Sequence, residues 1–434
     1  MPQIEVHDGK LENDRTTVIQ YDWKSEDFNQ RMNEIRLIAE QHLRPELMQT
    51  DRWVANIQFR VGKRVIIFDE ISNVLLSQTR SIIVFKDLSP HNLSVLIKKV
   101  LIDETPAQNI QTVNYSKYFL RSAEFCNCIP RLSPVNSKGK GGRPLLVVGS
   151  QKYHGAAILS ALACSRTGSD YTYLITHGEK LNVISQASPD IITQTYGPLC
   201  QKEDVMKLPF TSALIGSGLD RNESAQKLFF DTFEITQARK TPLVIDADGL
   251  HFLGVVLKQK PDILQNLQFP LILTPNQREF NNLYLRIFNE EAVGYNIVFL
   301  SPEVNGHYVK IDLEPAIAQV KKLADKLECC ILVKNIVDIC CYKGHVRITK
   351  TFGQPKRCSG QGDLLGGVLA CLINWGTNIC DQAIFGCEVV KRAGAKAYAK
   401  HKLGTVAYDL IAEIPGVIYE MVPENLQGYD LTWE

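Results

Sequence analysis

The chain has 434 residues, of which 45% are hydrophobic and 22% charged, and its formal net charge is +1. These are ordinary values for a globular protein of about two to three domains. The near-zero charge and the lack of a long basic run argue against a nucleic-acid partner. The polar amino terminus resembles neither a signal peptide nor a transit peptide, and no apolar stretch reaches ~18 residues. We therefore expect a cytoplasmic protein with no membrane segment.

Residues 1–104 are interpreted as a small α+β unit of unknown role. Residues 1–20 are expected to form a loosely held leader. The pattern that follows predicts a helix over 25–43, strands over 53–61, 64–68 and 81–85, and a second helix over 91–101. Residues 105–128 are polar and poorly periodic, which is typical of a linker.

Strands and helices alternate from about residue 129 onward. Strands are predicted at 145–149, 171–176, 213–216, 243–246, 271–274, 330–333 and 338–342, the last as one arm of a hairpin, with helices at 156–166 and 225–236. Repeated βα units predict an open, mostly parallel sheet with helices on both faces. Ligands of such folds bind outside the carboxyl ends of the strands.

A polar or glycine-rich turn follows each of five predicted strands. The turns are Gly149–Ala156, Ser217–Arg221, Asp246–Leu250, Thr274–Phe280 and Lys334–Asn335. Taken singly, each has a local explanation, such as a tight turn, an Asx-turn, a helix cap or a solvated strand end. These five turns, together with a sixth at Gly360–Asp363, fall at one edge of the sheet, so we expect all six to line a single cleft.

A sixth turn, Gly360-Gln361-Gly362-Asp363, leads directly into an apolar run at helical spacing. Small residues allow close approach of the backbone, and the free N–H groups of a helix amino terminus attract anions, so this turn predicts a phosphate site. Asp363 has two interpretations. It is either a helix cap that compensates the dipole or a catalytic base.

Twelve cysteines include the close pairs Cys126/Cys128, Cys329/Cys330 and Cys340/Cys341. No CxxC motif and no zinc-type Cys/His spacing occurs among them. Because several lie in apolar runs, we expect buried free thiols in a reducing compartment.

Six motifs resemble a known family in their order and intervals: VVGSQKYHGAA, IGSGLDR, VIDADGL, LTPNQREF, LVKN and CSGQGDLLGG. Over about residues 129–418 they resemble the ribokinase-like fold and, within it, the ATP-dependent (S)-NAD(P)H-hydrate dehydratase family. The resemblance implies a catalytic domain over 129–434 that uses ATP and Mg²⁺. Its reaction would return hydrated NADH or NADPH to NAD(P)H, with release of ADP and phosphate.

The resemblance also implies site residues. Asp363 would take the proton of the substrate hydroxyl. The implied ATP-binding residues are Lys334, Asn335, Ile336, Val337, Asp338, Gly353, Arg357, Cys358, Ser359, Gly360, Gln361 and Gly362. The implied substrate-binding residues are Gly218, Asn276, Gln277, Arg278, Glu279, Phe280, Asn281, Asn282 and Asp363. Magnesium is implied by the use of ATP, and its ligands are unknown.

The chain departs from the family pattern at four positions. In the usual GPGLGR, Ser217 replaces proline and Asp220 replaces glycine, Asn335 replaces the glycine of LKG, and Ser359 replaces a common glycine. Asp and Asn tolerate a left-handed backbone better than most residues. The charge of Asp220, however, would repel a dinucleotide phosphate.

Two other functions remain open at this stage. One is a small-molecule kinase of the same fold that acts on a vitamin-precursor alcohol. The other is a non-catalytic nucleotide-binding partner, against which the retained Asp363 argues. Preference between the two hydrated cofactors, and self-association of the chain, are left open by the sequence.

Overall fold

The computed structural model describes residues 115–133, 136–178, 181–198, 200–292, 309–376 and 378–426, and the backbone of short strands outside these ranges. The chain divides into two compact units. One consists of Met1–Tyr115 with Ile297–Ile311, and the other of Ser116–Asn296 with Asp312–Glu434.

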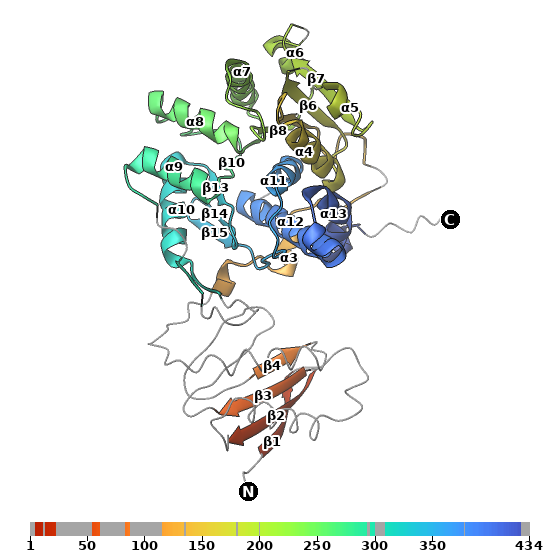
Figure 1. The fold of residues 1–434 in the computed structure, drawn as a ribbon, viewed down its shortest axis with the longest axis vertical. Helices are drawn as coiled ribbons and strands as arrows, with labels where there is room; N and C mark the ends of the chain where they lie inside the picture. Colours follow the sequence, from red (N-terminus) through yellow and green to blue (C-terminus); the bar gives the residue numbers. More distant parts are fainter. Residues whose placement is uncertain are drawn as a thin grey trace, which may run out of the picture. The chain divides into compact units, whose positions relative to one another are not determined.

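The smaller unit contains a sheet in the order β1-β2-β3-β4 (Figure 1). Its strands are β1 (Glu5–Leu11), β2 (Asp14–Asp22), β3 (Val54–Arg60) and β4 (Ile83–Lys86). β1 and β2 show that the expectation of a loosely held leader is wrong. The β-branched run from Thr16 to Ile19 favours a strand, in spite of its polar neighbours. The elements predicted over 25–43, 64–68 and 91–101 lie outside the described residues.

The larger unit is built on a sheet in the order β15-β14-β13-β10-β9-β8-β5-β6-β7. Its strands are β5 (Pro144–Val147), β6 (Thr172–His177), β7 (Ile191–Tyr196), β8 (Ser212–Ile215), β9 (Leu243–Ile245), β10 (Leu271–Leu273), β13 (Cys330–Val333), β14 (Ile339–Tyr342) and β15 (His345–Ile348). All are parallel except β14 and β15, which form the predicted hairpin on β13. The predicted open, mostly parallel sheet is confirmed.

The sequence analysis missed β7, which lies at the edge of this sheet. Its residues include Thr193, Gln194 and Thr195, and Ile192 is 41% exposed. A strand with one neighbour needs no continuous apolar run, so the signal that identified the central strands is absent here.

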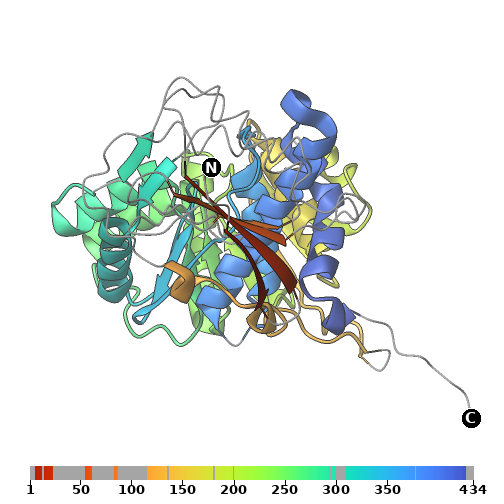
Figure 2. The same ribbon diagram turned by 90° about the horizontal axis from the view of Figure 1, so that it is seen from below.

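Helices cover both faces of the sheet (Figures 1 and 2). One layer contains α4 (His154–Thr167), α11 (Gln361–Leu372), α12 (Ile379–His401) and α13 (Ala407–Met421), and the other contains α7 (Glu223–Arg239), α8 (Asp248–Gln259), α9 (Gln277–Phe288) and α10 (Glu314–Leu327). α11 is buried from Leu364 to Leu372. It packs directly on α4 because Gly367 leaves room for the backbone of that helix. A Cβ at Gly367 would lie 2.0 Å from the carbonyl oxygen of Ser160.

The second half of the predicted linker packs against the larger unit. α3 (Ser122–Phe125) places the ring of Phe125 against Phe385 of α12, with 5.7 Å between ring centroids. Glu124 of α3 forms an ion pair with Arg347 of β15 at 2.8 Å. Residues 116–128 are therefore part of this unit, and residues 105–114 lie outside the described residues.

All twelve cysteines are free thiols, as predicted, and only Cys126 and Cys358 are more than slightly exposed. In the ranges that the structure describes, no helix has both the length and the apolar character that crossing a bilayer requires.

Candidate active site

The sheet has its topological switch point between β5 and β8. From β5 the chain proceeds to β6 and β7 in one direction, and through β8, β9, β10 and β13 in the other. The loops that follow β5 and β8 therefore diverge, which opens a crevice at the carboxyl ends of these strands. A cavity of about 390 Å³ lies there, lined by Tyr153, Gly218, Asp220, Arg221 and Asp248. Three of the predicted turns thus share one cavity, whereas the sequence analysis expected all of them to line a single cleft.

Asp246, which follows β9, forms hydrogen bonds with the turns after β8, β10 and β13. Its carboxylate accepts hydrogen bonds from Ser217 Oγ at 3.0 Å and from Thr274 Oγ1 at 2.7 Å. Lys334 Nζ, from the end of β13, donates to the same carboxylate at 2.5 Å. Asp246 is only 2% exposed, so the lysine is its charge partner in the interior. The turns after β8, β9, β10 and β13 therefore form one bonded group.

The Gly360 turn begins α11 beside this group. Gly360 has a φ of 93°, and a Cβ at this position would lie 2.4 Å from Leu159 Cδ1, so the turn requires glycine. A Cβ at Gly362 would lie 3.5 Å from Lys334 Nζ, which places the ammonium group against the first turn of α11. Backbone N–H groups and a lysine thus converge, and this arrangement suits a phosphate.

Asp363 stands in the first turn of α11. Burial and the nearby carboxylates of Asp246 and Asp248 raise its pKa to about 7, although Lys334 acts in the opposite direction. A capping carboxylate behaves differently. Asp204, in the first turn of α6 (Lys202–Lys207), accepts the backbone N–H of Gln201, and this bond lowers its pKa. The electrostatics of Asp363 therefore favour the base over the cap.

Asp248 and Arg221 form an ion pair on the wall of the cavity, with 2.8 Å between Arg221 Nε and Asp248 Oδ1. The backbone N–H of Asp220 donates to Asp248 as well, at 3.0 Å. Asp220 has a φ of 68°, a left-handed backbone that aspartate tolerates better than most residues. Its carboxylate adds a negative charge to the cavity.

The segment Lys334–Asp338 forms a tight turn supported from α12. The backbone N–H of Asn335 donates to Asp338 Oδ1 at 2.8 Å. Lys391 Nζ donates to the carbonyl oxygens of Asn335 and Ile336 at 3.0 and 2.8 Å and pairs with Asp338 at 3.2 Å. Asn335 has no positive φ, so in this chain the position does not need a residue that tolerates a left-handed backbone. Its amide instead donates to Gln277 Oε1 at 3.1 Å.

Two residues of this turn have little surface to offer a ligand. Val337 is 6% and Asp338 5% exposed, and they stabilise the turn from inside. Sequence reasoning missed Lys391, because a lysine in the middle of a long helix carries no motif.

The segment that leads to the Gly360 turn is held by contacts that each join a side chain to a backbone atom. Gly353 has a φ of 84°. The backbone N–H of Cys358 donates to Gln361 Oε1 at 3.1 Å, and its thiol contacts the carbonyl oxygen of Thr405 at 3.1 Å. Arg357 and Ser359 are exposed and available to a ligand.

The predicted substrate segment Asn276–Asn282 has mixed roles. Asn276 and Glu279 form a reciprocal cap at the start of α9, with bonds of 2.9 and 3.0 Å. Phe280 is 2% exposed and packs against the ring of Tyr284, so it belongs to the core and not to a ligand surface. Gln277 is half-buried and its amide donates to Asn281 Oδ1 at 2.8 Å, whereas Arg278 and Asn282 are exposed.

The chain was compared with known proteins. The sequence profile described as NAD(P)H-hydrate dehydratase matches residues 144–416. ATP-dependent (S)-NAD(P)H-hydrate dehydratase of Homo sapiens is 30% identical over 303 residues, which cover 66% of this chain and 80% of that protein. The protein of the same name from Caenorhabditis elegans is 29% identical over 314 residues, or 70% of this chain and 96% of that protein.

Solved structures agree with the fold. A ribokinase-like superfamily protein from Enterococcus faecalis has a TM-score of 0.55 at 19% identity, covering 72% of this chain and 99% of its own. ADP/ATP-dependent NAD(P)H-hydrate dehydratase from Bacillus subtilis, co-crystallized with ATP/Mg²⁺, has a TM-score of 0.54 at 19% identity, covering 70% and 98%. The predicted ribokinase-like fold is confirmed.

Proposed function

The chain belongs to the NAD(P)H-hydrate dehydratase family, and we propose that it catalyses the ATP-dependent dehydration of the S form of NAD(P)H hydrate to NAD(P)H, with release of ADP and phosphate. The observation that carries the proposal is the position of Asp363. It lies in the first turn of α11, beside Lys334 and Asp246, with its pKa raised to about 7.

The chemistry that we propose begins at the substrate hydroxyl. Asp363 takes the hydroxyl proton while the oxygen attacks the γ-phosphorus of ATP, and ADP leaves. Phosphate is a far better leaving group than hydroxide, so the C–O bond then breaks with release of phosphate. The adjacent ring carbon gives up a proton to solvent, and the ring double bond returns. A base with a pKa near the working pH is well suited to the first step. The backbone N–H groups of Gly360–Gly362 and the ammonium group of Lys334 would stabilise charge on the transferring phosphoryl group.

ATP and the hydrated cofactor would approach Asp363 from different segments. Lys334–Asp338 and the segment from Gly353 to Gly362 would hold ATP. The cavity beside Gly218 would hold the hydrated cofactor, with exposed residues at the start of α9 at its margin. Phosphate oxygens together with one or two carboxylates commonly hold Mg²⁺, so magnesium would enter with ATP.

The setting that we propose is the cytoplasm, with small-molecule partners. Twelve free thiols favour a reducing compartment. The formal net charge of +1 supports a protein that binds neither nucleic acid nor a membrane surface.

The test is an absorbance assay with hydrated NADH, ATP and magnesium. A rise at the reduced-nicotinamide band that requires ATP is the expected result. A stable phosphoester in place of NADH would instead indicate the kinase. No turnover with intact ATP binding would indicate the non-catalytic partner.

A further inference from the structure

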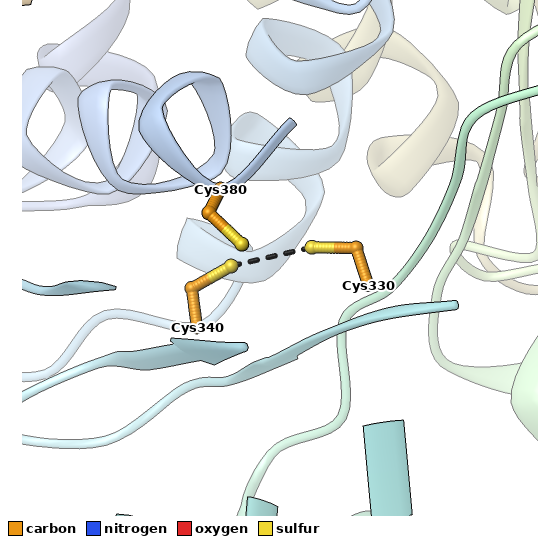
Figure 3. A group of neighbouring side chains, drawn as sticks. All are labelled: Cys330, Cys340 and Cys380. Atoms are coloured by element: carbon orange, nitrogen blue, oxygen red, sulfur yellow. Dashed lines mark hydrogen bonds between the residues drawn. The ribbon is translucent and has the colours of Figure 1, made fainter. Parts of the chain in front are cut away.

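Three cysteine thiols converge in the interior of the larger unit, and none of them takes part in the proposed chemistry. Cys330 belongs to β13, Cys340 to β14 and Cys380 to the first turn of α12 (Figure 3). Their sulfur atoms all lie within 4.8 Å of one another. Cys330 Sγ and Cys340 Sγ are 3.2 Å apart, well beyond a disulfide bond length, so they are separate thiols.

Strand register explains why the first two thiols meet. β13 and β14 pair with Leu332 opposite Cys340, and side chains alternate between the faces of a strand. Cys330, two residues before Leu332, therefore points to the same face as Cys340. This is the face that α12 covers. Cys329 and Cys341 point to the other face, so only one cysteine of each adjacent pair joins the group.

The surroundings of the group favour a soft ligand. The three residues are at most 1% exposed and belong to the apolar core with Leu332 and Leu369. In the described part of the chain, no histidine or carboxylate joins them to make a fourth ligand. His345 lies nearby, but its ring is directed at Asp381 Oδ1, 3.3 Å away.

We propose that Cys330, Cys340 and Cys380 form a three-coordinate thiolate site for a soft d¹⁰ metal ion, cuprous copper. Soft thiolates select Cu(I) and zinc among the common metals, and structural zinc is almost always held by four protein ligands. A buried set of three sulfur atoms without a fourth donor therefore fits Cu(I) better.

The electrostatic setting favours a thiolate at Cys380 only. Burial raises the pKa values of the Cys330 and Cys340 thiols, so these two would lose their protons only to a bound cation. Cys380 is the second residue of α12, a helix of 23 residues, where the dipole favours an anion. Arg347 stands directly opposite Cys340 on β15 and is 8% exposed. Its guanidinium group is shared by Asp381 and Glu124, so it is not a free counter-charge. The helix terminus is thus the main positive contribution.

A metal here would connect the elements that carry the ATP turn. β13 continues directly into Lys334, and α12 supplies Lys391, which supports Asn335 and Ile336. Bound copper would link β13 and β14 to α12 and so stabilise the Lys334–Asp338 turn. The inference does not depend on the proposed reaction, because metal binding is measured without substrate.

The experiment is a competition for copper by the full, reduced chain under anaerobic conditions. Cu(I) is titrated in the presence of bathocuproine disulfonate, and bound copper is counted per chain. The altered protein is Cys380→Ser, because serine has nearly the size of cysteine and the cap of α12 is supplied by Asn378, which stays in place. The matched control is Cys387→Ser, which changes a buried thiol of the same helix outside the group.

Wild type and Cys387→Ser are expected to bind one equivalent of Cu(I) more than Cys380→Ser. X-ray absorption should show three sulfur neighbours, and the thermal midpoint should rise with copper. Copper on the partly exposed Cys126 and Cys358 would be equal in all three proteins. Equal uptake by wild type and Cys380→Ser, or a ligand shell containing nitrogen or oxygen, would overturn the proposal. Tighter binding of zinc than copper at this group would overturn the assignment to Cu(I).

Cys340→Ala provides a second variant that removes a ligand without burying a hydroxyl group. Circular dichroism and the metal-free thermal midpoint identify a variant that fails to fold. If Cys340→Ala folds and retains the extra equivalent, the site is not the one proposed.

Discussion

Replacing Asp363 by asparagine should abolish turnover and make the protein more stable. The pKa of Asp363 rises from 3.8 to about 7 because the charged carboxylate is buried beside Asp246 and Asp248. Each pKa unit corresponds to about 1.4 kcal/mol, so keeping this group charged costs roughly 4 kcal/mol. The neutral amide of Asp363→Asn avoids this cost, and ATP binding should remain nearly unchanged.

The difference in free energy of unfolding between Asp363→Asn and wild type depends on pH. The raised pKa means that the folded state holds the proton of Asp363 more tightly than the unfolded chain does. The protonated form of Asp363 therefore stabilises the folded state. Its contribution to the free energy of unfolding is fully present below pH 3.8 and is lost as pH rises through about 7. Asp363→Asn should therefore gain on wild type by up to about 1.4 kcal/mol per pH unit between about pH 4 and 7, and the difference should be constant above that.

Urea unfolding from pH 5 to 8, combined with the NADH assay, measures both effects. Asp409→Asn is the control, because Asp409 also lies in the first turn of a helix, α13, but caps it by accepting the N–H of Val406 at 2.8 Å. That variant should lose about 0.3–1 kcal/mol at neutral pH and keep its activity. If Asp363→Asn retains more than about a tenth of the rate, the general-base role is wrong. A stability difference that does not change with pH would refute the electrostatic reasoning.

Three further predictions concern the same site. Lys334→Met leaves Asp246 buried without a charge partner, so unfolding experiments should show a loss of about 3–5 kcal/mol and kinetics a higher KM for ATP. Asp220→Gly removes a negative charge from the cavity and a side chain at a φ of 68°, so the KM for hydrated cofactor should fall while kcat changes little. A rise in KM would contradict repulsion between Asp220 and the phosphates of the cofactor. In wild type, kcat/KM should rise about tenfold per pH unit up to about pH 7 and then level off, and a flat profile between pH 6 and 8 would exclude Asp363 as the base.

The central strands and their turns were predictable because each is encoded locally. A continuous apolar run such as Leu145–Val148 can only be a buried strand or a piece of buried helix, and the glycines and polar residues that follow it end the segment. Their meeting at one edge followed from the rule for parallel sheets. The edge strand β7 was missed because, with one neighbouring strand, it lacks a continuous apolar run.

Contacts between distant segments were not predictable. Lys391 contacts Asn335, which is 56 residues away in the sequence, and Arg347 contacts Glu124, which is 223 residues away. No pattern in the sequence predicts either contact. The role of Phe280 was misjudged for a related reason. A motif identifies a segment that binds ligand, but the helical periodicity of the segment determines which of its side chains face the cavity. Phe280 faces the core.

The departures from the family pattern also depend on such contacts. Ser217 is fully buried, and its hydroxyl donates to Asp246, the carboxylate that also binds Lys334 and Thr274. A proline cannot donate this bond, so the substitution adds a partner to a buried charge and does not merely loosen a turn. Ser217→Ala should therefore remove one hydrogen bond from a buried carboxylate and destabilise the fold by about 1–3 kcal/mol, which urea unfolding measures. If Ser217→Ala is neutral, then Lys334 and Thr274 suffice, and the serine only fills the space that a proline occupies in the family pattern.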